Sequence, residues 1–292
     1  MNSTHQSPAG RDGRGLSAEE TAQLKQVCRH LRTSIINTVA HAHAGHTGGS
    51  LSEVEILAAL YFRILNIDPS RPNWPERDRF ILSKGHASPG YYCTLAYRGY
   101  FSEENLAEFD AVDSMLQGHP CRLHTPGVDM STGSLGQGIS AAAGMILGRD
   151  YLALKFNVFV LLGDGEIQEG QVWEAAMFAG ARRLTGLVAI IDRNGVQLSG
   201  TVADTLTLEP LPDKWKAFGW QVLECDGHDV AAVVATLEQA RRLSAAGPVA
   251  IIAHTVKGKG VSFMEGKYQW HGRSPNDEER RLALAEIEQA AR

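Results

Sequence analysis

Residues 156–200 read FNVFVLLGDGEIQEGQVWEAAMFAGARRLTGLVAIIDRNGVQLSG, and this stretch decides the fold. Its first seven residues are almost all apolar, as in a strand that is buried on both faces of a parallel sheet. A Gly-Asp-Gly turn follows at 163–165, then a helical pattern over Gln168–Arg183 and a second apolar run at Leu187–Ile191. This order predicts two parallel strands that are joined by a right-handed helical crossover.

Asp164 and Asn194 each follow one of these strands, so both are expected at the carboxyl edge of the sheet, where open α/β sheets bind ligands. Glycines flank Asp164 and allow backbone amides to approach an anion closely. A carboxylate, an amide oxygen and backbone carbonyls are hard donors that suit Mg²⁺ when it also holds phosphate oxygens. The pattern predicts a metal–pyrophosphate site, and two ordinary polar turns are the alternative that the spacing leaves open.

Composition narrows the functional classes. The 292 residues are 43% hydrophobic and carry a net charge of −5, which gives no basic face for nucleic acid. No apolar run approaches the roughly 18 residues that a membrane span needs. Four scattered cysteines show neither metal spacing nor a disulfide framework, which predicts a cytoplasmic protein. Residues 1–16 are predicted to be a disordered tail, and residues 17–292 a single domain.

Strand and helix patterns alternate along the rest of the chain. They predict an α/β fold with an open, mainly parallel sheet and helices on both faces. Further strands are expected at Asp78–Leu82, Trp220–Glu224 and Val249–His254. Capping boxes at Ser17–Glu20 and Ser50–Glu53 predict the starts of two helices in the first 65 residues.

Four histidines stand beside glycines in predicted loops: His46, His86, His119 and His271. Loops at one sheet edge would aim them at a common crevice. Imidazoles there could donate to sugar hydroxyls or phosphate and carry protons near neutral pH. For each histidine taken singly, a hydrogen-bonded or surface position is the simpler alternative.

Several motifs carry a resemblance to a known family. In chain order they are AGHTGG, DRFILSKGHAS, GHP, STGSLGQG, LLGDGE, VWEA, DRNGVQLSG, FGW, DGH, KGKG and WHG. Together they cover about residues 17–273 and closely resemble the amino-terminal, pyrophosphate-binding half of transketolase. The Gly-Asp-Gly turn, followed about thirty residues later by Asn194, resembles the thiamine-diphosphate fingerprint of that fold. AGHTGGS departs from the family, which usually has His-Pro at this point, and this leaves the shape of the His46 loop open.

The resemblance implies roles for individual residues. It implies that Asp164, Asn194 and the Val196 carbonyl hold Mg²⁺, with Ca²⁺ or Mn²⁺ as alternatives. The residues that it implies for binding thiamine diphosphate are Lys84, His86, Gly133, Ser134, Leu135, Gly165, Glu166, Asn194, Lys257 and His271. His46, His119 and His271 would be catalytic, contacting sugar oxygens and moving protons. Glu169 resembles a carboxylate that links paired active sites, and a solvated helix glutamate is its alternative.

The resemblance also implies a partner. In transketolases the glutamate that activates the cofactor belongs to a separate pyrimidine-binding domain, for which no motif occurs here. We therefore expect the first subunit of a split transketolase, which pairs with a C-terminal subunit and with itself across a two-fold axis in a heterotetramer. It would transfer a two-carbon ketol unit from a ketose phosphate to an aldose. The alternatives are a subunit of a deoxyxylulose-phosphate synthase-like or 2-oxo acid decarboxylating enzyme, and a non-catalytic relative.

Overall fold

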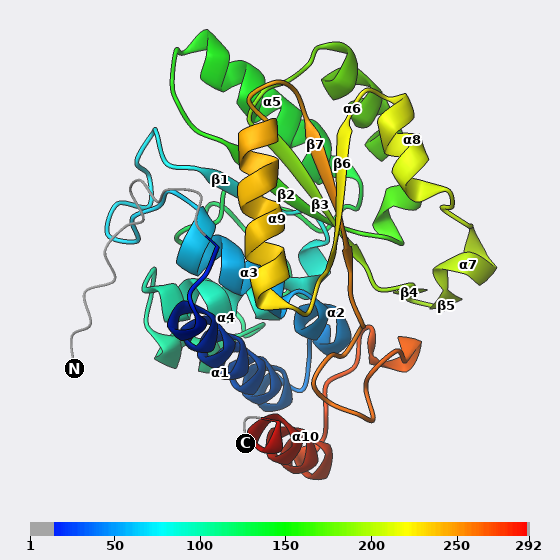
Figure 1. Cartoon of the computed structure of the whole chain (residues 1–292). Helices are drawn as coiled ribbons and strands as arrows, with labels where there is room; N and C mark the ends of the chain where they lie inside the picture. The colour runs from blue at the N-terminus through cyan, green and yellow to red at the C-terminus, as the bar shows by residue number, and fades with distance from the viewer. Residues whose placement is uncertain (1–14, 291–292) are drawn as a thin grey trace.

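A five-stranded parallel sheet forms the centre of the structure, a computed structural model that describes residues 15–290 (Figure 1). Its strands, in spatial order, are β1 (Arg79–Leu82), β2 (Val158–Gly163), β3 (Leu187–Arg193), β7 (Val249–His254) and β6 (Gln221–Asp226). All four neighbouring pairs run parallel. The predicted α/β class and the parallel sheet are thus confirmed. Of the predicted tail only Gly15 and Leu16 are described, and Leu16 packs against the core.

Successive side chains of each strand enter two separate hydrophobic clusters, one on each face of the sheet. In β3, Val188 and Ile190 belong to one cluster, while Leu187, Ala189 and Ile191 belong to the other. Both faces are therefore buried, which explains why the strands read as continuous apolar runs rather than as an alternating pattern.

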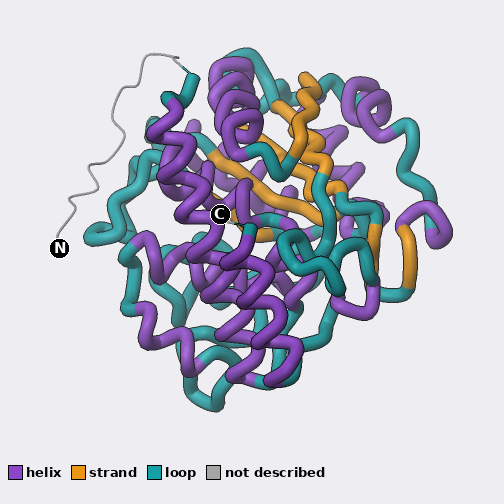
Figure 2. Tube along the Cα trace, turned by 60° about the horizontal axis from the view of Figure 1, so that its bottom comes forward, coloured by secondary structure: helices purple, strands orange, loops and turns teal. Residues whose placement is uncertain are grey.

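Helices cover both faces, as predicted. One cluster is completed by α1 (Ala18–Ala42), α3 (Val54–Ala59), α4 (Ser88–Arg98) and α9 (Val230–Leu243). The other is completed by α5 (Gln137–Tyr151), α6 (Gly170–Ala181) and α8 (Leu211–Ala217). Figure 2 shows the strands running between these helices. No helix within residues 15–290 is long and apolar enough to cross a membrane.

Short elements make up most of the remaining structure. The helical ones are α2 (Thr47–Ser52), α7 (Val202–Thr205), α10 (Asp277–Gln289), the π-helical turn η1 (Leu60–Ile64) and the 3₁₀ turns η2 (Gly85–Ala87), η3 (Glu103–Glu108), η4 (Glu166–Gln168) and η5 (Tyr268–Trp270). β4 (Val196–Gln197) and β5 (Gly200–Thr201) form an antiparallel hairpin directly after β3.

One predicted capping box is confirmed and the other is wrong. Ser17 Oγ accepts from the N–H of Glu20, and the Glu20 carboxylate accepts from the N–H of Ser17. The second helix begins at Thr47 instead, and Glu53 lies in the break between α2 and α3. The Glu53 carboxylate forms a buried ion pair with Lys84, 2.8 Å away, so it is used in a long-range contact rather than as a cap.

The connections place a crevice between β3 and β7. The chain reaches β3 through α6 on one face of the sheet, and it reaches β7 through α9 on the other face. Neighbouring strands whose preceding helices lie on opposite faces mark a topological switch point, where the carboxyl ends of the strands leave room for a ligand.

Candidate active site at the carboxyl edge of the sheet

Asp164 lies at the carboxyl end of β2 and is tied to the turn after β3. Its carboxylate accepts from the N–H of Gly165 at 2.8 Å and from the N–H of Gly195 at 2.5 Å. Gly195 directly follows Asn194, so the two predicted metal-binding residues belong to one cluster. Burial, together with the nearby Asp192 carboxylate, raises the pKa of Asp164 to about 6.

Asn194 and Val196 form a tight turn beside this carboxylate. The Asn194 side-chain oxygen accepts from the N–H of Val196 at 3.1 Å. Next to them, the side-chain oxygen of Gln197 is buried without a hydrogen-bond partner. Within residues 15–290 no group of three His, Cys, Asp or Glu residues could by itself hold a metal ion. A metal here would therefore need amide, carbonyl and ligand oxygens beside Asp164, which is the predicted set.

Lys84 is fully buried at the end of β1 and neutralised by protein groups. Its ammonium contacts the carboxylates of Asp192 at 2.7 Å and Glu53 at 2.8 Å, and donates to the carbonyl of Gly49 at 2.9 Å. Burial opposes the charge, but the two carboxylates outweigh it and raise the pKa of Lys84. Burial raises the pKa of Glu53 to about 8. The ammonium therefore supports the site from below through its three protein contacts.

Glu166 also bonds inward. Its carboxylate accepts from the hydroxyl of Ser83 and, at 3.0 Å each, from the N–H groups of Gly136 and Gly163. These bonds join the ends of β1 and β2 to the segment before α5. Of the predicted cofactor residues in that segment, Ser134 and Leu135 are exposed.

The four predicted histidines do come together. The ring of His46 lies 5.1 Å from His86, 5.3 Å from His271 and 6.3 Å from His119, measured between centroids. His86 stacks on His271 at 4.8 Å. They come from four separate loops, so the parallel sheet, not local sequence, assembles the cluster.

Lys257 brings positive charge to this cluster. Its ammonium lies 2.9 Å from Nδ1 of His271. Burial and the proximity of Lys84 lower the pKa of Lys257 to about 8. Burial, His119 and Lys257 lower the pKa of His46 to about 4, and burial, Lys257 and His46 lower that of His271 to about 3. Burial, followed by His271 and Lys84, also lowers the pKa of His86. These three imidazoles are therefore neutral at pH 7.

Glycines allow the loops to approach this closely. A Cβ on Gly48 would lie 2.8 Å from both Lys257 Cγ and the carbonyl oxygen of Trp270. Gly133 has a φ of +138°, and a Cβ there would lie 2.8 Å from the ring of His119. Neither position accepts a side chain without moving the groups of the site.

The two halves of the site lack opposite charges. Asp164 is a buried carboxylate whose raised pKa would be reversed by a cation, while Lys257 and the histidines have lowered pKa values that an anion would reverse. The buried Oγ1 of Thr132, beside Gly133, also has no hydrogen-bond partner. A divalent metal bound to a diphosphate supplies both charges, so the residues present fit this group.

Sequence reasoning missed three residues that support the site. Ser52 donates to Asp192 at 2.6 Å, Thr255 donates to its other oxygen, and Glu53 completes the ion cluster around Lys84. Each lies far from Lys84 in the sequence, and none belongs to a pattern that predicts burial. Glu169 is exposed at the start of α6 and contacts none of the site groups described above.

Comparisons with known proteins agree with this geometry. The family model for the transketolase thiamine diphosphate binding domain matches residues 23–287. The 6-deoxy-6-sulfo-D-fructose transketolase subunit SqwG of Clostridium sp. (strain MSTE9) is 46% identical over 271 residues, 93% of this chain and 98% of the relative. One of the two subunits of the apulose-4-phosphate transketolase of Actinobacillus succinogenes is 45% identical over 266 residues, 91% of this chain and 96% of the relative.

Solved structures add a longer comparison. A mutant transketolase from Pichia stipitis superposes with a TM-score of 0.85 at 28% identity, over 91% of this chain and 40% of that chain. The chain thus spans about two-fifths of the length of that transketolase. These matches favour the transketolase prediction over the 2-oxo acid alternative. The chain belongs to the transketolase family and contains its thiamine diphosphate binding domain.

Proposed function

We propose that this chain is the amino-terminal subunit of a two-chain transketolase that binds thiamine diphosphate with Mg²⁺ at the carboxyl edge of its sheet. With a C-terminal subunit it transfers a two-carbon ketol unit from a ketose to an aldose. The observation that carries the proposal is the pairing of Asp164, which lacks a cation, with the Lys257–histidine cluster, which lacks an anion.

Asp164, Asn194 and the Val196 carbonyl are the proposed metal ligands. Lys257, His86 and His271 are proposed to face the diphosphate and the reacting ring, while the backbone at 133–135 and Gly165 lines the cofactor. When bound, thiamine diphosphate supplies the electron sink that carbon–carbon cleavage beside a carbonyl requires.

The neutral histidines are proposed to handle the protons. Nδ1 of His271 accepts from the Lys257 ammonium, so its ring proton lies on Nε2 and is free to donate to a sugar oxygen. His46 lies within 5.1–6.3 Å of the other three rings and is proposed to accept a hydroxyl proton from the substrate. Its low pKa keeps the imidazole unprotonated and ready for this step.

A partner chain and a second copy complete the proposed assembly. The two relatives are named as subunits, which supports a separate C-terminal chain that closes over the cofactor. On α5 and α6 several large apolar side chains are exposed: Leu147, Tyr151, Met177 and Phe178. We assign this apolar face to self-association across a two-fold axis, with Glu169 at its edge, because a cluster of this kind marks an interaction surface. The resulting assembly is a heterotetramer.

The proposed donor is a ketose that carries an acidic group far from its carbonyl. The printed names of the two relatives specify a 6-sulfo sugar and a 4-phosphate sugar. All four cysteines are free thiols, which supports a cytoplasmic location.

Reconstitution tests the function. The chain is expressed with and without a C-terminal transketolase subunit, and xylulose 5-phosphate or pyruvate is supplied as donor in thiamine diphosphate and Mg²⁺. We expect ketol transfer from xylulose 5-phosphate only by the pair. Turnover by the chain alone contradicts the two-chain proposal. Release of CO₂ from pyruvate would instead identify a decarboxylating subunit, and no cofactor binding by the pair would identify a non-catalytic relative.

A further inference from the structure

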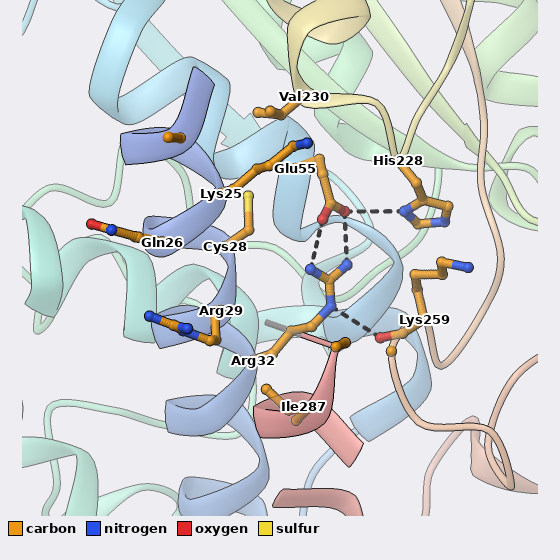
Figure 3. A pocket seen from close by; sticks show the side chains of 13 residues that line it. Lys25, Gln26, Cys28, Arg29, Arg32, Glu55, His228, Val230, Lys259 and Ile287 are labelled. Carbon is orange, nitrogen blue, oxygen red and sulfur yellow. Dashed lines mark hydrogen bonds and ion pairs between the residues drawn. The ribbon is translucent and has the colours of Figure 1, made fainter. Parts of the chain in front are cut away.

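A buried ion pair lies behind the Lys257 loop, on the side away from the histidine cluster. Arg32 of α1 binds both carboxylate oxygens of Glu55 at 2.6 and 2.8 Å, and its Nε donates to the carbonyl of Lys259 at 3.1 Å (Figure 3). Burial opposes the charge of Glu55, but Arg32 and His228 outweigh it and lower the pKa of the carboxyl to about 2. Glu55 is thus a fixed, ionised acceptor.

His228 binds this carboxylate from the other side. Its Nδ1 lies 3.0 Å from Glu55 Oε2, while its Nε2 lies 2.8 Å from the backbone nitrogen of Val256. The Val256 N–H can only donate, so Nε2 must be the unprotonated nitrogen and Nδ1 must carry the proton that goes to Glu55. The two contacts fix both the tautomer and the orientation of the ring.

The Val256 amide is the last backbone group before Lys257. Beyond Lys257, the N–H of Gly258 donates to the carbonyl of Gly48 at 3.0 Å, and Gly48 packs against the Lys257 side chain. The segment around Lys257 is therefore held at one end by His228 and at the other by Gly48. A displacement of the Val256 amide would carry the Lys257 ammonium away from His271.

Arg32 and Glu55 do not need His228 to satisfy each other, because the guanidinium already binds both oxygens of the carboxylate. The further consequence of the imidazole is the bond to Val256. We propose that His228 is a positioning residue for Lys257: held by Glu55, it fixes the Val256 amide and thereby the ammonium that faces the cofactor diphosphate. The part that concerns the cofactor rests on the proposed function.

Two isosteric variants separate the two bonds of the ring. In His228→Asn the amide nitrogen takes the place of Nδ1 and keeps the bond to Glu55, but nothing accepts from Val256. In His228→Gln the amide oxygen takes the place of Nε2 and keeps the acceptor for Val256. His254→Asn and His254→Gln are matched controls, because His254 pairs with Glu224 at 2.9 Å on the exposed surface at the end of β7.

Two measurements are made on each variant. Hydrogen exchange of the Val256 amide in the cofactor-free chain should speed up more than about tenfold in His228→Asn and stay within about threefold of wild type in His228→Gln. Thiamine diphosphate affinity of the assembled enzyme should fall about tenfold in His228→Asn and little in His228→Gln, since small displacements of a binding group are costly. The controls should match wild type in both.

Chemical rescue tests the same bond in the absence of a side chain. His228 lines a cavity of about 560 Å³, together with Arg32 and Lys25, through which a small molecule can enter (Figure 3). Added imidazole should restore cofactor affinity to His228→Ala, and should leave His254→Ala unchanged. A ring that serves only packing would give equal losses in His228→Asn and His228→Gln, and that result overturns the proposal, as does an absence of rescue.

The outcome is separable from that of the proposed function. If the wild-type pair binds no thiamine diphosphate, the proposed function and the cofactor part of this inference both fail. The exchange rates of the cofactor-free variants still decide whether His228 holds the Val256 amide, because they need no ligand.

Discussion

The carboxylate of Asp164 accepts a hydrogen bond from the backbone N–H of Gly195 at 2.5 Å, across two neighbouring strands of the sheet. This bond closes the end of β2 onto the turn that follows β3. The same carboxylate is buried, near Asp192, and has a raised pKa. It is thus held in place while still lacking a counter-charge, as expected of a preorganised cation ligand.

Asp164→Asn should abolish most metal-dependent cofactor binding. Removing a metal ligand should cost at least as much as the roughly 100-fold that is lost when a supporting partner of such a ligand is removed. Titration calorimetry of the assembled enzyme with thiamine diphosphate and Mg²⁺ measures the loss. Asp213→Asn, at an exposed ion pair with Lys216, is the control and should bind normally. Unchanged binding by Asp164→Asn would remove Asp164 from the metal site.

Lys84→Met should destabilise the chain strongly. It leaves two buried carboxylates without their cation, and breaking such a buried pair costs about 3–5 kcal/mol. Urea unfolding gives the value. Lys216→Met breaks an exposed pair instead and should cost less than about 1 kcal/mol. Adding Glu53→Gln to Lys84→Met should recover part of the loss, because it removes one of the two buried acids. Equal stability of the two lysine variants would refute a structural role for Lys84.

The cofactor-free chain should lose stability as pH falls below 6.5. The pKa of His46 is lowered to about 4 and that of His271 to about 3, so the unfolded chain takes up protons that the folded chain does not. The contribution is complete above pH 6.5 and is lost progressively toward pH 4. His46→Gln should reduce the difference in unfolding free energy between pH 7 and pH 4.5 by about 1 kcal/mol, after allowance for partial exposure. An identical pH dependence in both proteins would mean that His46 titrates normally.

Gly133→Ala should impair catalysis through His119. The added Cβ would lie 2.8 Å from that ring, at a backbone φ of +138° that disfavours any side chain. We expect kcat to fall at least about tenfold, from displacement of a contact to the substrate. Gly144→Ala, inside α5 with nothing within 4 Å, is the control and should raise stability by about 0.5–1 kcal/mol. Full activity in Gly133→Ala would place His119 outside the reaction.

Met177→Glu should weaken self-association. Met177 is 55% exposed on α6, in the face assigned to the two-fold interface, where a charge would be buried without a partner. Sedimentation velocity of the assembled enzyme should show one copy of each subunit instead of two. Leu282→Glu, on exposed α10, is the matched control and should leave the assembly intact. A normal heterotetramer from Met177→Glu would move the interface elsewhere.

The sheet is predictable because each strand carries its own signal. The apolar run Val249–His254 has the bounds that β7 shows, since apolar residues fill both faces of the strand. The sequence predicts that β2 begins at Phe156, but it begins at Val158. The N–H of Asn157 is taken by Asp78, which comes from a distant loop. Such a contact has no local signature.

The candidate site is predictable only where it follows from sheet geometry. Parallel strands bring Asp164, Asn194 and the histidine loops to one edge, so their convergence could be expected. The Glu53–Lys84–Asp192 cluster could not, because the sequence around Glu53 has the pattern of a helix cap. The sequence places His228 only at the end of a strand, and its bond to Val256 depends on how α9 and β7 pack.

The opposite pKa shifts on the two sides of the crevice have a thermodynamic consequence. Each ligand charge is stabilised by protein groups that the other leaves uncompensated, and the two charges also attract one another. Occupancy by the divalent ion should therefore tighten the grip on the vitamin diphosphate, and by linkage the diphosphate should tighten the grip on the ion by the same factor. Such a pair enters and leaves as one neutralised unit, and the protein retains neither half firmly alone.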